Sequence, residues 1–175
     1  EKIREHFGDG SRFGVSITYV EEQKEGGTAT PLLKAKRFLQ QGPFLMLYGD
    51  VLIDINLHDL IDFHLQEDGE ATLAVTTVSE SSEFGVLRLH GSTIVDFLEK
   101  PPKSGKLSKL VNTGVYVMNP SIFKRIPKKA FSMLEQDVFP AMAKEGELRG
   151  FLFEGHWFDI GTPEIYERVL QEWKK

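Results

Sequence analysis

Along this chain, short runs that are apolar at nearly every position alternate with stretches in which apolar residues recur every three or four positions. The first pattern is typical of strands and the second of amphipathic helices. Residues 44–48 are apolar at every position, which favours a strand buried on both faces, as in a parallel sheet. The same reasoning predicts further strands over residues 17–20, 71–78, 115–118, 150–153 and 157–160.

Helix starts are marked by residues that cap or initiate a first turn. Thr30 stands before Pro31, and Thr162 stands before Pro163, a residue whose missing N–H is harmless at the first helical position. Asn56 precedes a third stretch of helical spacing. We therefore predict helices after each of these caps, and shorter ones over residues 121–126 and 133–144.

Residues 84–89 and 93–98 alternate between apolar and polar around a Gly-containing turn, which predicts a β-hairpin. No internal repeat or linker divides the 175 residues, a length typical of one domain. The sequence thus predicts a single α/β domain over residues 1–175, with a mostly parallel sheet and an added antiparallel hairpin region.

The amino-acid composition excludes several classes of function. With 41% hydrophobic residues the chain can bury a core, so disorder is excluded. The 21 basic and 26 acidic side chains leave a net charge of −5, which argues against a broad nucleic-acid-binding face. Without cysteine there is no thiolate zinc site or cysteine nucleophile. We expect neither a nucleic-acid nor a membrane partner, and a cytoplasmic location.

Two aspartates stand out. Asp50 comes just past the apolar strand, where open α/β sheets bind ligands, although it is equally suited to a turn. Asp159 lies among Trp157, Phe158 and Ile160, where a carboxylate needs a cation, a metal or several N–H donors. Together they could share one Mg²⁺, although Asp159 could also merely accept backbone N–H groups of the following turn.

Two further motifs are candidates for ligand binding. Glu99 and Lys100 end the hairpin; they could meet sugar hydroxyls and a phosphate, or form an exposed ion pair. Gly26-Gly27-Thr28 could bring backbone N–H groups to a nucleotide, but it is weak evidence and does not form a Walker sequence.

Seven motifs follow one another along the chain. They are Glu25-Gly26-Gly27-Thr28-Ala29, residues 44–50 ending in Tyr-Gly-Asp, Phe84-Gly85-Val86, Glu99-Lys100-Pro101, Val111-Asn112-Thr113-Gly114-Val115-Tyr116, Glu135-Gln136-Asp137-Val138-Phe139-Pro140, and Trp157-Phe158-Asp159-Ile160-Gly161-Thr162-Pro163. This succession resembles the sugar-1-phosphate nucleotidylyltransferases, or nucleotide-sugar pyrophosphorylases, and is most similar to mannose-1-phosphate guanylyltransferases. The resemblance covers essentially the whole chain and implies a Rossmann-like nucleotidyltransferase fold with helices on both faces of the sheet.

The resemblance also implies a reaction and a role for each matching residue. An oxygen of a sugar-1-phosphate would attack the α-phosphorus of a nucleoside triphosphate and expel pyrophosphate, with positioning and charge neutralisation as the main sources of catalysis. The implied roles are Asp50 and Asp159 as Mg²⁺ ligands, Gly27 and Thr28 with Asp50 at the nucleotide, Gly85, Glu99 and Asn112 at the sugar, and Lys100 near its phosphate.

The sequence departs from the family in two places. The family's Gly-rich, triphosphate-binding strand and loop is not found here, and the chain begins at Glu1. We therefore expect a preceding segment of perhaps two βα units, about 70 residues, and expect the chain as given to be inactive and unable to fold alone. Thr30 stands where these enzymes often have Gly or Ala.

Other functions stay open at this point. Glucose-1-phosphate with a thymidine or uridine nucleotide is the second choice of substrates. A non-catalytic regulatory domain of the same fold, as in the translation initiation factor 2B complex, is the competing class, and a generic α/β binding domain is a third. Such regulatory domains tend to lose the acidic pair and the Glu-Lys pair, both of which are present here. Because relatives often assemble, a homo-oligomer is also open.

Overall fold

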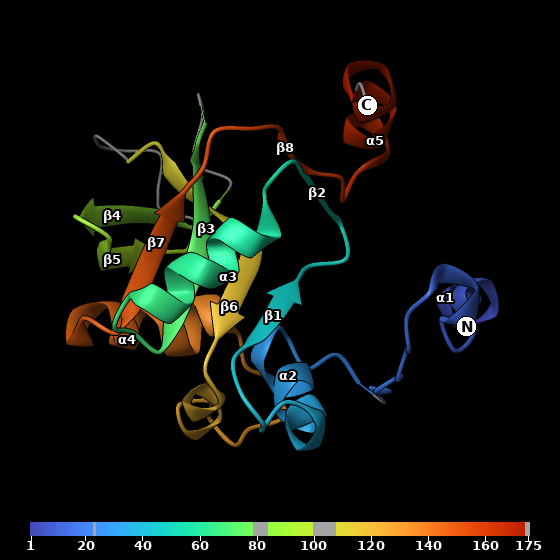
Figure 1. Ribbon diagram of the computed structural model, residues 1–175, viewed down its shortest axis with the longest axis horizontal. Coiled ribbons are helices and arrows are strands. Elements are labelled where there is room, and N and C mark those ends of the chain that lie inside the picture. The colour runs from blue at the N-terminus through green and yellow to red at the C-terminus, as the bar shows by residue number, and fades with distance from the viewer. Residues whose placement is uncertain (23, 79–83, 100–107, 174–175) are drawn as a thin grey trace.

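A computed structural model describes residues 1–22, 24–78, 84–99 and 108–173 (Figure 1). Its core is one six-stranded sheet. In spatial order the strands are β1 (Phe44–Leu47), β6 (Leu110–Met118), β3 (Ala71–Thr77), β7 (Leu148–Leu152), β5 (Thr93–Leu98) and β4 (Val86–His90). A separate two-stranded ribbon pairs β2 (Val51–Ile53) with β8 (Trp157–Asp159).

The large sheet is mixed, whereas a mostly parallel sheet was expected. Among the described pairings only β3–β7 is parallel. β6 is the cause, because it returns from the predicted hairpin, which the structure contains as β4 and β5, and lies antiparallel to both β1 and β3. As a result β1, β3 and β7 still run in one direction, with β6 inserted against them.

β1 does not have the environment that its apolar sequence predicts. Its only pairing in the described part of the chain is with β6, so it forms an edge of the large sheet. Its first three residues are half-buried, and Leu47 is 45% exposed. A uniformly apolar run therefore indicated a strand correctly but did not indicate a central one.

Helices cover both faces of the sheet, as predicted. On one face, α2 (Ala29–Ala35), the π-helical turn η4 (Leu134–Val138) and α4 (Phe139–Glu145) bury the larger apolar cluster around Tyr116 and Phe139. On the other face α3 (Leu57–Gln66) places Leu60 against Val115 and Val117. Figure 1 shows α3 in front of the sheet and α1 (Lys2–Phe7) and α5 (Pro163–Glu172) lying away from it.

Local capping signals explain two of the helix starts. The side chain of Asn56 accepts a hydrogen bond from the N–H of His58 at 3.0 Å, and that of Thr162 accepts one from Ile165 at 3.4 Å. Thr30 does not cap its helix, because α2 already begins at Ala29. Its hydroxyl instead meets Ser132 Oγ at 3.0 Å, a contact 102 residues away in sequence.

The remaining elements differ in detail. Residues 17–20, predicted as a strand, form none and take part in no strand pairing of the described residues. The short helices at Ser11–Phe13, Lys36–Phe38 and Pro120–Lys124 are 3₁₀ turns. Within the described ranges, no helix is both long and apolar enough to cross a membrane.

Candidate active site

The β2–β8 ribbon brings the two predicted aspartates together. Asp50 immediately precedes β2 and Asp159 ends β8, where it pairs with Val51. The N–H of Ile160 donates to the carbonyl of Asp50 at 2.7 Å, which ties the two strand ends to each other. Thus two residues 109 positions apart become neighbours through backbone pairing alone.

Their carboxylates converge on a space left by a glycine. A Cβ added to Gly161 would lie 3.1 Å from Asp159 Oδ1 and 3.7 Å from Asp50 Oδ2, so one oxygen of each faces the same point. Asp159 also accepts the N–H of Gly161 at 3.1 Å, so the structure includes the turn contact that sequence alone left as an alternative. Asp50 is exposed, and Asp159 is half-buried rather than enclosed as its apolar neighbours suggested.

This donor set fits a hard divalent cation. The described residues contain no cluster of three or more His, Cys, Asp or Glu side chains that could hold a metal. Two carboxylates suit an ion such as Mg²⁺, which prefers oxygen ligands and keeps positions for water and substrate phosphate.

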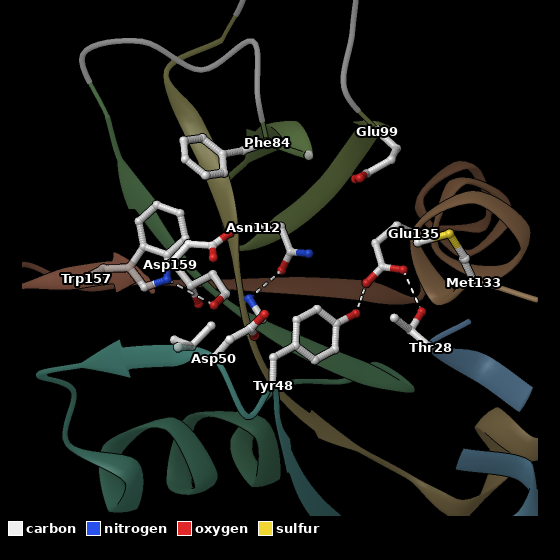
Figure 2. Close-up of a pocket in the computed structure, with 14 residues that line it drawn as sticks. Thr28, Tyr48, Asp50, Phe84, Glu99, Asn112, Met133, Glu135, Trp157 and Asp159 are labelled. Atoms are coloured by element: carbon white, nitrogen blue, oxygen red, sulfur yellow. Dashed lines mark hydrogen bonds between the residues drawn. The ribbon is translucent and has the colours of Figure 1, made fainter. Parts of the chain in front are cut away.

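A cavity of about 240 Å³ opens beside this pair (Figure 2). It is lined by Thr28, Tyr48, Asp50, Val51, Phe84, Gly85, Glu99, Asn112, Thr113, Gly114, Met133, Glu135, Trp157 and Asp159. Phe84 and Trp157 form an aromatic wall with ring centroids 4.9 Å apart, and the indole N–H of Trp157 donates to the carbonyl of Thr113 at 3.0 Å. Six residues predicted from sequence therefore share one cavity with several that were not.

The three predicted sugar contacts, Gly85, Glu99 and Asn112, all line this cavity and contact one another. The N–H of Asn112 donates to the carbonyl of Gly85 at 2.9 Å, which joins β6 to the start of the hairpin. A Cβ at Gly85 would lie 2.7 Å from Glu99 Oε2, so this carboxylate rests directly against the glycine backbone. Lys100, the predicted phosphate contact, lies outside the described residues.

The predicted nucleotide loop packs against a distant segment of the chain. The N–H of Ala29 donates to the carbonyl of Ser132 at 2.9 Å, and the N–H of Ser132 donates to the carbonyl of Gly26 at 3.0 Å. Gly27 adopts a left-handed φ of +76° with its α-carbon facing Ser132. Thr28 lines the main cavity, whereas Gly27 lines a more open hollow beside it that also includes Thr28 and Asp50.

Glu135 is the main site residue to which sequence reasoning assigned no role. The residue is 4% exposed, and its carboxylate accepts hydrogen bonds from the hydroxyls of Thr28 (2.7 Å), Tyr116 (3.4 Å) and Tyr48. Burial raises the pKa of the Glu135 carboxyl, and the Thr28 hydrogen bond opposes that shift. The sequence does not mark this burial as it does for Asp159, because the polar residues Gln136 and Asp137 follow Glu135 directly.

Tyr116 links Glu135 to the sugar side of the cavity. It is fully buried in β6, and burial raises the pKa of its phenol, so it remains a neutral hydroxyl. Its oxygen accepts a hydrogen bond from the amide of Asn112 at 2.7 Å. The amide oxygen of Asn112 in turn accepts the N–H of Gly114 at 3.2 Å, so both ends of that side chain have partners.

Comparison with known proteins gives the site its context. Residues 1–175 match the sequence profile of a family described as nucleotidyl transferase. The chain is 38% identical over 158 residues to mannose-1-phosphate guanylyltransferase catalytic subunit beta of Dictyostelium discoideum, covering 89% of this chain and 43% of that protein. It is also 38% identical over 160 residues to a mannose-1-phosphate guanyltransferase of Aspergillus oryzae, with coverage of 89% and 43%. The chain thus spans less than half the length of these curated relatives.

Solved structures show the same fold. One, described as a glucose-1-phosphate thymidylyltransferase from Bacillus anthracis with sucrose, superposes with a TM-score of 0.87 at 24% identity, covering 98% of this chain and 70% of that one. A UDP-glucose pyrophosphorylase complexed with UDP-glucose gives a TM-score of 0.78 at 20% identity, with coverage of 98% and 71%. The expected α/β nucleotidyltransferase fold is therefore confirmed.

Proposed function

The chain belongs to the nucleotidyl transferase family, and on that premise we propose that it transfers a nucleoside monophosphate from a nucleoside triphosphate to a sugar-1-phosphate, releasing pyrophosphate. GTP and mannose-1-phosphate are the substrates we propose, because the curated relatives that it matches carry the name mannose-1-phosphate guanylyltransferase. The competing class, a regulatory domain of the same fold, is disfavoured because the acidic pair is intact.

One observation carries this proposal. The acidic pair, Asp50 and Asp159, and the group formed by Gly85, Glu99 and Asn112 line the same cavity. A sugar-1-phosphate has hydroxyls at one end and a phosphate at the other, so it needs hydrogen-bonding groups and charge neutralisation in one cavity. Thr28, the proposed nucleotide contact, lines the same cavity. A nucleotide bound there would therefore lie next to both the acidic pair and the sugar-1-phosphate.

The chain's residues would act mainly by holding the two substrates. Asp50 and Asp159 would hold Mg²⁺, which when bound neutralises charge on the phosphates and the pyrophosphate that departs. Gly27 and Thr28 would position the nucleotide. Glu99 would accept hydrogen bonds from the sugar hydroxyls, and the amide of Asn112 would donate to them. Lys100 would contact the sugar phosphate. Fixing the attacking oxygen near the α-phosphorus contributes through proximity and orientation, and no protein nucleophile is needed.

A substrate panel tests the proposal. The complete protein is incubated with Mg²⁺, each nucleoside triphosphate, and either mannose-1-phosphate or glucose-1-phosphate, and released pyrophosphate is measured. We expect the highest kcat/KM with GTP and mannose-1-phosphate. A preference for glucose-1-phosphate with a thymidine or uridine nucleotide would change the assigned substrates but support the same type of reaction. If no pair releases pyrophosphate, the proposed enzymatic activity is refuted.

A pair of aspartate variants tests the acidic pair. Asp159→Asn keeps the side-chain size and an acceptor for the N–H of Gly161 while removing the charge, so turnover should fall by at least about a thousandfold, roughly 4 kcal/mol. Asp54→Asn is the matched control, because Asp54 is an exposed aspartate at the other end of the same ribbon and does not line the cavity. Equal activity of the two variants would refute a metal site at Asp159.

A further inference from the structure

Residues 132–135 pack against the proposed nucleotide loop, and Met133 and Glu135 also line the cavity. Ser132 exchanges two backbone hydrogen bonds with the loop, and the N–H of Leu134 donates to the hydroxyl of Thr28 at 2.9 Å. The same hydroxyl donates to Glu135 Oε2 at 2.7 Å. Thr28 is therefore held from both sides by this one segment.

Glu135 has further hydrogen-bond partners besides Thr28, and Figure 2 shows its bonds to Thr28 and Tyr48. Its second oxygen accepts the hydroxyls of Tyr48 and Tyr116, and the hydroxyl of Tyr116 accepts the amide N–H of Asn112. A continuous path thus runs from Thr28 through Glu135 and Tyr116 to Asn112. Its two ends are residues proposed to contact different substrates.

Burial makes the members of this path depend on one another. An ionised carboxylate only accepts hydrogen bonds, and Glu135 is almost completely removed from water, so the neighbouring hydroxyls must donate to it. When Tyr116 donates to Glu135, its oxygen lone pairs face Asn112 and accept the amide N–H, in the orientation that the N–H of Gly114 also favours. Because Thr28 and Tyr116 share the Glu135 carboxylate, a ligand that holds Thr28 in place also holds that carboxylate and, through Tyr116, the amide of Asn112.

We propose that Glu135 is a positioning residue that couples the two substrate sites, so that a bound nucleotide increases the affinity for the sugar-1-phosphate and the reverse. This proposal rests on the proposed function. Because coupling between two ligands is reciprocal, either affinity can be used to measure it. Coupling between sites is typically about 5-fold to 150-fold in affinity, and we expect at least about fivefold here.

Calorimetric titration of the complete protein measures the coupling. Mannose-1-phosphate is titrated with Mg²⁺ present, first alone and then with a saturating GTP analogue whose α,β-bridging oxygen is a methylene, which prevents transfer. The ratio of the two Kd values is the coupling. Should the substrate panel identify another pair, that pair and its methylene analogue are used.

Three variants separate coupling from simple structural damage. Glu135→Gln keeps the shape but replaces one acceptor oxygen by a donor, so the ratio should fall below about twofold while each ligand still binds. Tyr116→Phe cuts the path beyond Glu135, so the ratio should fall in the same way with an unchanged Kd for the analogue alone. Asp137→Asn is the matched control, because Asp137 lies on the same turn but bonds Lys129 and the N–H of Met133 instead; its ratio should equal that of the wild type.

The outcomes are distinguishable. A wild-type ratio of one, or a wild-type ratio retained in both Glu135→Gln and Tyr116→Phe, would overturn the coupling while leaving the reaction intact. If Glu135→Gln does not fold, Tyr116→Phe decides the question. Failure of every substrate pair to bind the wild-type protein would instead overturn the proposed function, and the coupling with it.

Discussion

Replacing Gly27 by Ala tests whether the nucleotide loop is docked on Ser132 as the structure describes. Gly27 has a φ of +76°, and an added Cβ would lie 2.4 Å from the carbonyl oxygen of Ser132. Because that oxygen belongs to the backbone, it cannot rotate away like the end of a side chain. Either the loop or the segment carrying Ser132 must move.

The expected loss of stability has two parts. A left-handed backbone costs a residue with a Cβ roughly 1–2 kcal/mol. Moving the loop also breaks the two backbone hydrogen bonds that Ser132 makes with Gly26 and Ala29, each worth about 0.5–1.5 kcal/mol net. We therefore expect the free energy of unfolding to fall by about 2–5 kcal/mol.

Gly91→Ala is the matched control for this substitution. Gly91 has a φ of +61° in the β4–β5 turn, and an added Cβ would meet nothing within 4 Å. This variant carries the backbone cost alone, about 1–2 kcal/mol. The difference between the two variants in urea denaturation of the complete protein isolates the close approach to Ser132.

The KM for the nucleotide is a second, independent measurement on the same two variants. Displacing the loop moves Thr28 away from the cavity, so Gly27→Ala should raise the KM for the nucleotide by roughly tenfold, equivalent to about 1.4 kcal/mol of binding. Gly91→Ala should leave that KM unchanged. If the two variants lose equal stability and keep equal nucleotide KM values, the docking of the loop on Ser132 is wrong.

Two further predictions concern the sugar side and the buried carboxylate. Gly85→Ala would place a Cβ 2.7 Å from Glu99 Oε2, so the carboxylate must move; the KM for the sugar-1-phosphate should rise while the nucleotide KM stays constant, and an unchanged sugar KM would contradict the proposed contact. Burial raises the pKa of Glu135 above its ordinary 4.5, so its contribution to stability is fully present below that pH and is lost as the pH rises through the raised pKa. As the pH is raised from about 4 to about 8, the free energy of unfolding of the wild type should therefore fall relative to that of Glu135→Gln. For Asp137→Asn the sign is reversed, because the hydrogen bond from Lys129 lowers the pKa of Asp137 and its contribution is lost as the pH falls. If the stability differences between the wild type and these two variants do not vary with pH, the pKa shifts of Glu135 and Asp137 are wrong.

Local signals predicted most of the secondary structure and part of the site. The caps at Asn56 and Thr162 act on N–H groups two or three residues away, and the turn at Gly91 joins two adjacent strands, so a short window of sequence contains both partners. The motif order indicated the family, which the comparisons confirm. Asp50, Asp159, Gly85, Glu99 and Asn112 were selected in this way, and the structure brings them to one cavity.

What tertiary structure decided depends on contacts between distant parts of the chain. The apolar run of β1 indicates a strand, but only its neighbours determine that it lies at an edge of the sheet and pairs antiparallel to β6. Thr30 has the chemistry of a cap, yet its hydroxyl bonds Ser132 instead. Glu135 meets Thr28 across 107 residues of sequence, and the packing of these distant segments buries the carboxyl. That burial raises the pKa of Glu135, although the Thr28 hydrogen bond opposes the shift. A side chain's hydrogen-bonding capacity is present in the sequence, whereas its partners and its exposure to water are set only when the sheet and its covering helices pack together.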